Sequence, residues 1–209
     1  MSDDLSPKSL TSEKSLWDIY LKARRIKFNS FNFWSTFVVF VLISLQYCAL
    51  DISLDSKLQV VREFSGMAIS LVVSVLGFIL AGFTIFATIS QPDMLVAMSK
   101  FRHEESQLSY LKNNFFIFMR VFIYYLAYAV FCLLIIAFAV KGGLIHKVVQ
   151  FSPISWKITE WLVGATYVTL YGGMFFLLMQ LKSFIFNVYH TVMTAIRWKA
   201  IQLEGEARR

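Results

Sequence analysis

Charge is scarce in this sequence, and where it is missing matters more than how much there is. Only 16% of the 209 residues are charged, whereas 57% are hydrophobic. No charged side chain occurs anywhere from Phe64 to Pro92. Because a typical soluble domain carries about 25% charged residues, this composition indicates a chain that is built for a lipid bilayer.

Cysteine and catalytic motifs are equally sparse. The two cysteines, Cys48 and Cys132, lie in apolar stretches, which excludes a disulfide framework and is typical of buried thiols. His103-Glu104 is not followed by the second histidine of a zinc-protease helix, and the other histidines stand alone. The sequence contains no nucleophile elbow and no glycine-rich phosphate loop. We therefore predict no enzymatic activity, no metal and no cofactor.

The chain does contain four long apolar stretches. Each is at least as long as the roughly 20 residues that a transmembrane helix needs, and no segment between them is long enough to bury its own core. We predict an all-α integral membrane protein, a four-transmembrane-helix bundle with short amphipathic cytoplasmic helices. The transmembrane domain would cover residues 31–188, with spans at about 31–50, 64–90, 115–140 and 161–186.

The distribution of Lys and Arg predicts the orientation of these spans. Six lie in residues 1–30, four in residues 90–120 and five in residues 182–209, against five in the two opposite loops. Because positive residues favour the cytoplasmic side, we expect both termini in the cytoplasm and the protein in a bacterial inner membrane or a plasma membrane. The polar first 27 residues lack the apolar core of a signal peptide, so the first span would be an uncleaved anchor.

Residues 1–30 are predicted to form a cytoplasmic tail followed by an interfacial amphipathic helix. Ser12 would be its N-cap. Two interpretations remain open: the helix lies on the membrane surface, or it packs against another segment of this protein or of a partner. Its apolar side consists of Leu16, Ile19, Tyr20, Ala23 and Ile26.

Two further cytoplasmic segments are predicted to be helical. Pro92 suits the first turn of a helix, so residues 93–113 are expected to form one. The last span is expected to continue as a helical C-terminal tail over residues 189–209. On the opposite side, Asp51–Glu63 is expected to be a short loop.

A stripe of small or hydroxyl-bearing side chains runs through the second span. Its members recur every three or four residues, which places them on one face of a helix. Small residues permit close helix contact in lipid, and hydroxyls suit the lining of a pore. Three interpretations therefore stay open: packing within the bundle, contact between copies, and pore lining. The stripe consists of Gly66, Ser70, Ser74, Gly77, Ala81, Thr84 and Thr88.

Three further positions in the fourth span are predicted to form a second packing face. They repeat a small side chain at every fourth residue, again on one helix face. This face consists of Ala165, Thr169 and Gly173.

Arg120 and Lys182 lie inside the ends of their spans, where charge is costly. Their long side chains can reach the headgroup region, which predicts contact with lipid headgroups or another anion. Alternatively, they would line a polar cavity open to the cytoplasm, together with Tyr124, Tyr128 and Asn187.

These patterns favour an oligomeric subunit of the pore or ion-channel type, or a membrane effector controlled by a cytoplasmic partner. One alternative is a non-conducting scaffold that anchors a complex, and another is a lipid- or anion-handling protein. The expected partners are anionic lipids, further copies of the chain and a cytoplasmic protein. Direct nucleic-acid binding is not expected, because the positive residues are dispersed over three segments.

Overall fold

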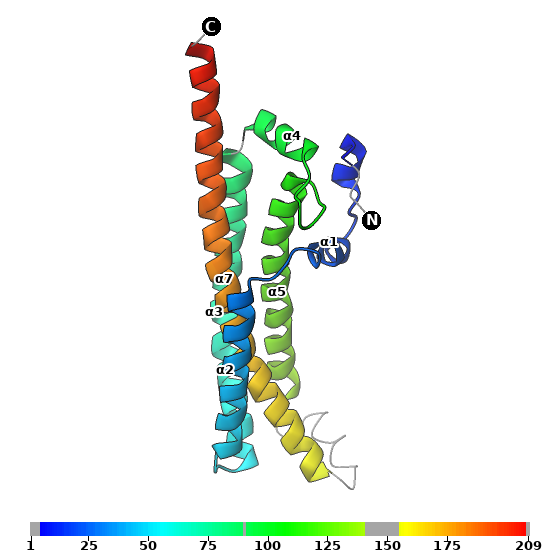
Figure 1. The fold of residues 1–209 in the computed structure, drawn as a ribbon. Helices are drawn as coiled ribbons and strands as arrows, with labels where there is room; N and C mark the ends of the chain where they lie inside the picture. Colours follow the sequence, from blue (N-terminus) through cyan, green and yellow to red (C-terminus); the bar gives the residue numbers. More distant parts are fainter. Residues whose placement is uncertain (1–4, 90, 141–154, 208–209) are drawn as a thin grey trace. The chain divides into compact units, whose positions relative to one another are not determined.

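The computed structural model describes residues 5–89, 91–140 and 155–207, and its folded elements over these ranges are helices. The described residues form no β-strand, only an isolated bridge between Arg102 and Ser109. The all-α prediction is therefore confirmed. Four helices are long and apolar enough to cross a membrane (Figure 1). They are α2 (Ser30–Ala49), α3 (Leu54–Ile89), α5 (Tyr110–Phe138) and α7 (Ser155–Ala207).

Three shorter elements accompany the long helices. A 3-10 helix, η1, covers Pro7–Thr11, and α1 covers Leu16–Ala23. The third is α4, which covers Pro92–Lys100 and has proline in its first turn. The N-cap of α1 is Ser15 rather than the expected Ser12, because the Ser15 hydroxyl accepts the backbone N–H of Asp18 at 3.1 Å.

Helix α3 begins at Leu54, well before the apolar stretch that predicts it. The segment Asp51–Glu63, expected to be a loop, is therefore mostly helical. Ser53 supports this early start, because its hydroxyl oxygen accepts the backbone N–H of Ser56 at 3.2 Å. Hydropathy marks where a helix is apolar enough for lipid, whereas capping and backbone hydrogen bonds decide where it begins.

The helix expected over residues 93–113 stops at Lys100. The chain then turns back on itself, with the His103 N–H donating to the Leu108 carbonyl at 2.8 Å and the Tyr110 N–H donating to the Phe101 carbonyl at 3.0 Å. These bonds satisfy backbone groups that a continuous helix would otherwise have paired. Gln107 takes a left-handed conformation, φ 57°, to close the turn.

The described residues belong to two compact units. Unit 1 combines Met1–Phe28, Gly77–Ile123 and Gln180–Arg209. Unit 2 combines Asn29–Leu76 and Tyr124–Met179. Helices α3, α5 and α7 therefore each contribute one portion to each unit.

Aromatic rings fill the core of unit 1. Phe118 of α5 lies between Phe86 of α3 and Phe184 of α7, with ring centroids 5.3 Å away in both directions. All three side chains are buried. Gly82 makes room for this cluster, because a Cβ there would lie 3.0 Å from the Phe184 ring. Such ring pairs contribute about 0.5–1.5 kcal/mol each beyond the area they bury.

Unit 2 is held together by aromatic side chains that reach the backbone of α7. The Tyr125 hydroxyl donates to the Leu177 carbonyl at 2.9 Å, and the Tyr128 hydroxyl donates to the Leu170 carbonyl at 2.6 Å. From α2, Phe40 lies so close to Gly172 that a Cβ there would be 2.6 Å from its ring. Glycine is therefore required at this position for α2 and α7 to approach each other.

Candidate functional site

The stripe of small and hydroxyl-bearing residues from Gly66 to Thr88 lies on the exposed face of α3, and we call it the α3 stripe. All seven of its residues are exposed. At Gly66 and Gly77, an added Cβ would meet no atom of the described residues within 4 Å. Over the described residues, the stripe is therefore the uncovered face of α3, and its three interpretations stay predictions.

The opposite face of α3 makes the contacts within the chain. Its buried residues recur at steps of three, four or seven residues, which keep them on one helix face. At about 100° per residue, the two rows lie on roughly opposite sides of the helix. Sequence spacing identifies both rows but does not distinguish the covered one from the open one. The buried row consists of Val61, Ser65, Ala68, Val72, Ile79 and Phe86.

The hydroxyls of the stripe donate to the backbone of α3 itself. Ser74 donates to the Ser70 carbonyl at 2.9 Å, and Thr88 donates to the Thr84 carbonyl at 2.9 Å. Thr84 donates to the Leu80 carbonyl at 3.0 Å. Each hydroxyl proton is therefore satisfied, and each oxygen keeps lone pairs that can accept from water or bind a cation.

One of the three residues of the predicted second packing face makes a close contact within the chain. Ala165 and Thr169 are exposed, whereas Gly173 packs against Tyr128. The other close contacts are made by Gly164, against Tyr47, and Gly172, against Phe40. One residue along a helix corresponds to a rotation of about 100°. Ala165 therefore points away from the side on which its neighbour Gly164 is packed.

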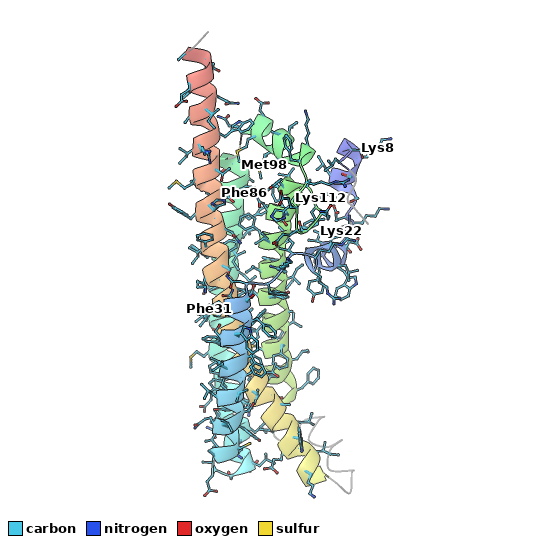
Figure 2. The ribbon with its side chains drawn as sticks, viewed as in Figure 1. Lys8, Lys22, Phe31, Phe86, Met98 and Lys112 are labelled. Atoms are coloured by element: carbon cyan, nitrogen blue, oxygen red, sulfur yellow. The ribbon has the colours of Figure 1, made fainter. Side chains whose placement is uncertain are left out.

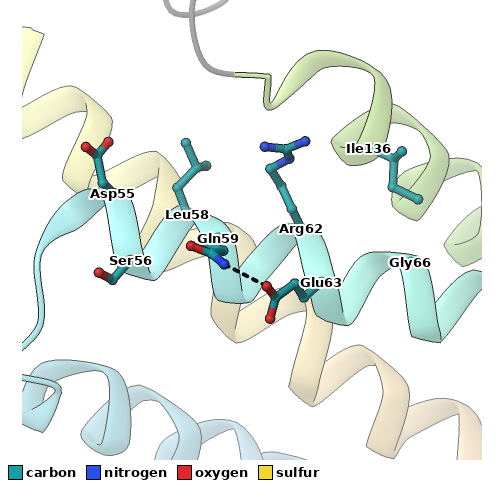
Figure 3. A pocket seen from close by; sticks show the side chains of 8 residues that line it. All are labelled: Asp55, Ser56, Leu58, Gln59, Arg62, Glu63, Gly66 and Ile136. Atoms are coloured by element: carbon teal, nitrogen blue, oxygen red, sulfur yellow. Dashed lines mark hydrogen bonds between the residues drawn. The ribbon is translucent and has the colours of Figure 1, made fainter.

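A hollow in unit 2 adjoins the first residue of the stripe. It measures about 500 Å³, and Figure 3 shows its wall along the start of α3. Gln59 donates to Glu63 at 2.8 Å, while Arg62 extends toward the side of Ile136 (Figure 3). Carboxylates and a guanidinium are therefore gathered at this end of the stripe. The lining consists of Asp55, Ser56, Leu58, Gln59, Arg62, Glu63, Gly66 and Ile136.

Unit 1 contains a cavity of about 480 Å³ between α4, α5 and α7. Its polar lining carries carboxamide, hydroxyl, indole and imidazole groups but no acidic, Lys or Arg side chain. Asn113 is buried there, and its Oδ1 accepts the hydroxyl of Ser106 at 2.8 Å. Of the residues predicted to line a polar cavity, Asn187 does so, whereas Arg120, Tyr124, Tyr128 and Lys182 are not part of the lining.

Arg120 is buried against α1 and is only 6% exposed. Its Nη1 donates to the Ile26 carbonyl at 2.7 Å and to the Ala23 carbonyl at 3.3 Å. Its guanidinium also lies 4.6 Å from the centre of the Phe28 ring. Arg120 thus satisfies carbonyls where α1 ends, and its expected headgroup contact stays a prediction. Lys182 is exposed on α7.

Glu13 joins the N-terminal segment to α5 through a contact that sequence reasoning missed. Its side chain is 7% exposed and that of Lys112 is 5% exposed, with Lys112 Nζ donating to Glu13 Oε1 at 2.9 Å. Lys112 also donates to the Ser9 carbonyl at 2.6 Å, and Lys22 donates to the same carboxylate oxygen. Figure 2 labels both lysines. We call Glu13, Lys22 and Lys112 the N-terminal clasp.

The clasp determines the ionisation of its carboxylate. Burial alone would raise the pKa of Glu13, but hydrogen bonds from Lys22, Lys112 and Ser12 outweigh it and lower the pKa from 4.5 to about 2. The carboxylate is therefore charged throughout the physiological pH range.

Helix α1 packs on α5 beside the clasp. Ala23, Leu108 and Phe116 form a buried cluster, with Ile19 and Ile26 against it. Packing on another segment of the same protein, one of the two interpretations of this helix, therefore describes its inner side. No sequence pattern pairs Glu13 with Lys112, because one lies in a polar tail and the other in the first turn of an apolar helix.

Among the described residues, the cysteines and the other side chains able to bind a metal form no common site. Cys132 is buried, whereas Cys48 is exposed on α2. Over the described ranges, no three His, Cys, Asp or Glu side chains are grouped so as to hold a metal ion. No family model matches the chain, and no curated protein or solved structure matches it either.

Proposed function

We propose that this protein is a membrane-embedded subunit whose copies meet through the α3 stripe and enclose a water-filled pore. The observation that carries the proposal is the contrast between the two faces of α3: one row is buried in the chain, and the stripe opposite is exposed over its whole length.

The physics of helix contact in lipid supports assembly through this face. Lipid tails are as apolar as the side chains they surround, so small residues promote association by letting helices approach closely. Gly66 and Gly77 have open space where a Cβ would stand. A neighbouring helix can therefore approach the α3 backbone at both positions.

The chemistry of the stripe determines what kind of pore it would line. Its hydroxyl oxygens are acceptors, and no member of the stripe is charged. A pore lined in this way would pass water and small ions with weak selectivity. Asp55, Arg62 and Glu63 lie at one end of the stripe and would determine which ions gather there.

The cavity of unit 1 supports control by a cytoplasmic partner. It is lined by Met94, Ala97 and Met98 of α4, and α4 begins at Pro92, directly after α3 ends at Ile89. A partner that inserts a side chain beneath α4 would move the segment attached to the Thr88 end of the stripe.

Ion flux from sealed liposomes that contain the full-length protein tests this function. Gly77→Leu fills the stripe and is expected to abolish flux. Ala87→Leu introduces the same side chain at an exposed position of α3 about 100° away from Thr88 of the stripe and is expected to leave flux unchanged. Liposomes that stay sealed with the unaltered protein, with and without a cytoplasmic extract, would contradict pore formation.

A non-conducting scaffold is the alternative, and one observation favours it. The stripe hydroxyls are already satisfied by the α3 backbone, so this face can lie against another helix without any water. Copies that cross-link through Gly77→Cys while the liposomes remain sealed would support the scaffold. The guanidinium of Arg120 is engaged by the end of α1, which disfavours a lipid- or anion-handling function built on this residue.

A further inference from the structure

Helix α1 has an outer face that no described segment covers. Its inner side, with Ile19 and Ala23, packs on α5. On the other side, Trp17 is 65% exposed and Leu21 is 45% exposed. At about 100° per residue, these two side chains lie within one narrow sector of the helix.

Positive charge adjoins this outer face. Arg24 falls in the same sector as Trp17 and Leu21, and Arg25 follows it; both are exposed. Lys27 is also exposed and forms an ion pair with Glu105 at 3.5 Å. Tryptophan flanked by arginine is the combination that the boundary between lipid headgroups and acyl chains accommodates best.

The chain keeps α1 close to the apolar helices. Only residues 24–29 separate it from α2, whose N-cap is Asn29. Even fully extended, six residues reach about 20 Å, less than the thickness of a bilayer. Arg120, from the long apolar helix α5, also binds the carbonyls at the end of α1. The outer face therefore stays within about 20 Å of the start of α2 along the chain, and α1 is attached to α5 through Arg120.

We propose that Trp17 and Leu21 insert into the headgroup–acyl boundary of an anionic bilayer, with Arg24 on lipid phosphates. This inference rests on the membrane insertion that the proposed function assumes. Phosphate attracts the arginines, and the acyl boundary takes the indole and the leucine, so a lipid surface satisfies both parts of the face at once.

The structure also explains how so short a helix holds this face in position. Helices shorter than about 12 residues are marginal in water, and α1 has 8. Ser15 caps its start, Arg120 binds the carbonyls at its end, and Glu13 fixes the preceding turn to Lys112. Because α1 is ordered before it meets lipid, binding has less conformational entropy to overcome.

The test measures lipid contact at single positions of the full-length protein in liposomes of phosphatidylglycerol and phosphatidylcholine. Cys48→Ser and Cys132→Ala provide a background without thiols. Trp17→Cys or Leu21→Cys then carries an environment-sensitive fluorophore, and brominated lipids quench the fluorophores that they touch. Lys8→Cys, exposed on η1, is the control for water, and Leu45→Cys, exposed on α2, is the control for membrane insertion.

We expect loss of fluorescence at positions 17 and 21 comparable to that at 45, with none at position 8. Removing phosphatidylglycerol, or introducing Arg24→Gln, is expected to reduce the quenching at 17 and 21 but not at 45. Quenching at 45 without quenching at 17 and 21 would overturn this inference and leave membrane insertion intact, as expected if a protein or a second copy covered the face. No quenching at 45 would overturn membrane insertion itself.

Discussion

The Nζ of Lys112 lies 2.9 Å from the Oε1 of Glu13, although 99 positions separate the two residues in the chain. This ion pair and the Arg120–Ile26 hydrogen bond attach the N-terminal segment to α5 at two points. The segment is thereby converted from a polar tail into a part of unit 1.

The ion pair is expected to contribute measurably to the stability of this attachment. Lys112→Met removes hydrogen bonds to the carboxylate and to the Ser9 carbonyl. A hydrogen bond to a charged group contributes about 1.5–3 kcal/mol, so amide exchange in residues 7–23 should accelerate by one to two orders of magnitude. The matched variant Lys100→Met, on the exposed end of α4, should leave exchange there unchanged; equal effects of the two variants would contradict this role.

Acid should release the same segment. Because the pKa of Glu13 in the folded chain is about 2, below its ordinary value of 4.5, ionisation of this carboxylate stabilises the attachment fully above pH 4.5. The contribution is lost progressively as the pH falls toward 2 and is constant between pH 5 and 8. Limited proteolysis of the N-terminal segment across pH 2–8 measures the effect. In Glu13→Gln, this component of the acid dependence should be absent.

Arginine is required at position 120 for its geometry as well as its charge. Lys retains the charge but lacks the planar guanidinium, which lies over the Phe28 ring while its Nη1 donates to both carbonyls. Arg120→Lys is therefore expected to destabilise α1 by about 1–2 kcal/mol, read as faster exchange of its amides. The control is Lys182→Arg, which changes an exposed cation on α7. Unchanged protection of α1 in Arg120→Lys would refute the capping role.

The glycines of α7 and α3 should respond differently to the same substitution. At Gly172, a Cβ would lie 2.6 Å from the Phe40 ring, so Gly172→Ala is expected to cost about 1–3 kcal/mol through overpacking. At Gly66 nothing lies within 4 Å among the described atoms, so Gly66→Ala should instead gain the helix preference of alanine, about 1 kcal/mol. Thermal unfolding in detergent measures both.

Local patterns in the sequence predict the helical class and the four long apolar helices, because helix formation and hydropathy depend on neighbouring residues. The limits of α3 and α4 depend on the Ser53 cap and on the turn around Gln107, which hydropathy does not record. The sequence shows two rows at helical spacing on α3, namely the α3 stripe and the row that contains Val72 and Ile79. Spacing alone does not distinguish them. Which row is buried depends on the helices that pack against it.

Contacts over long sequence distances could not be predicted at all. From the sequence, Arg120 is expected to contact lipid headgroups. In the structure, its Nη1 donates to carbonyls at the end of α1. From the sequence, Glu13 is expected to be an acidic residue in the first turn of a helix. In the structure, it forms an ion pair with Lys112. In both cases the partner is determined by tertiary packing, and a single sequence carries no signal that pairs the two residues.

Accessibility of single cysteines along α3, measured in liposomes with a water-soluble thiol reagent, tests the central claim most directly. Only a thiol in contact with water reacts, because the thiolate is the reactive form. The proposed pore predicts labelling at Ser70→Cys, Ser74→Cys and Thr84→Cys, with none at the exposed apolar positions Val73→Cys and Leu80→Cys. Stripe cysteines that stay unlabelled under conditions that label Lys8→Cys would contradict a water-filled path along α3.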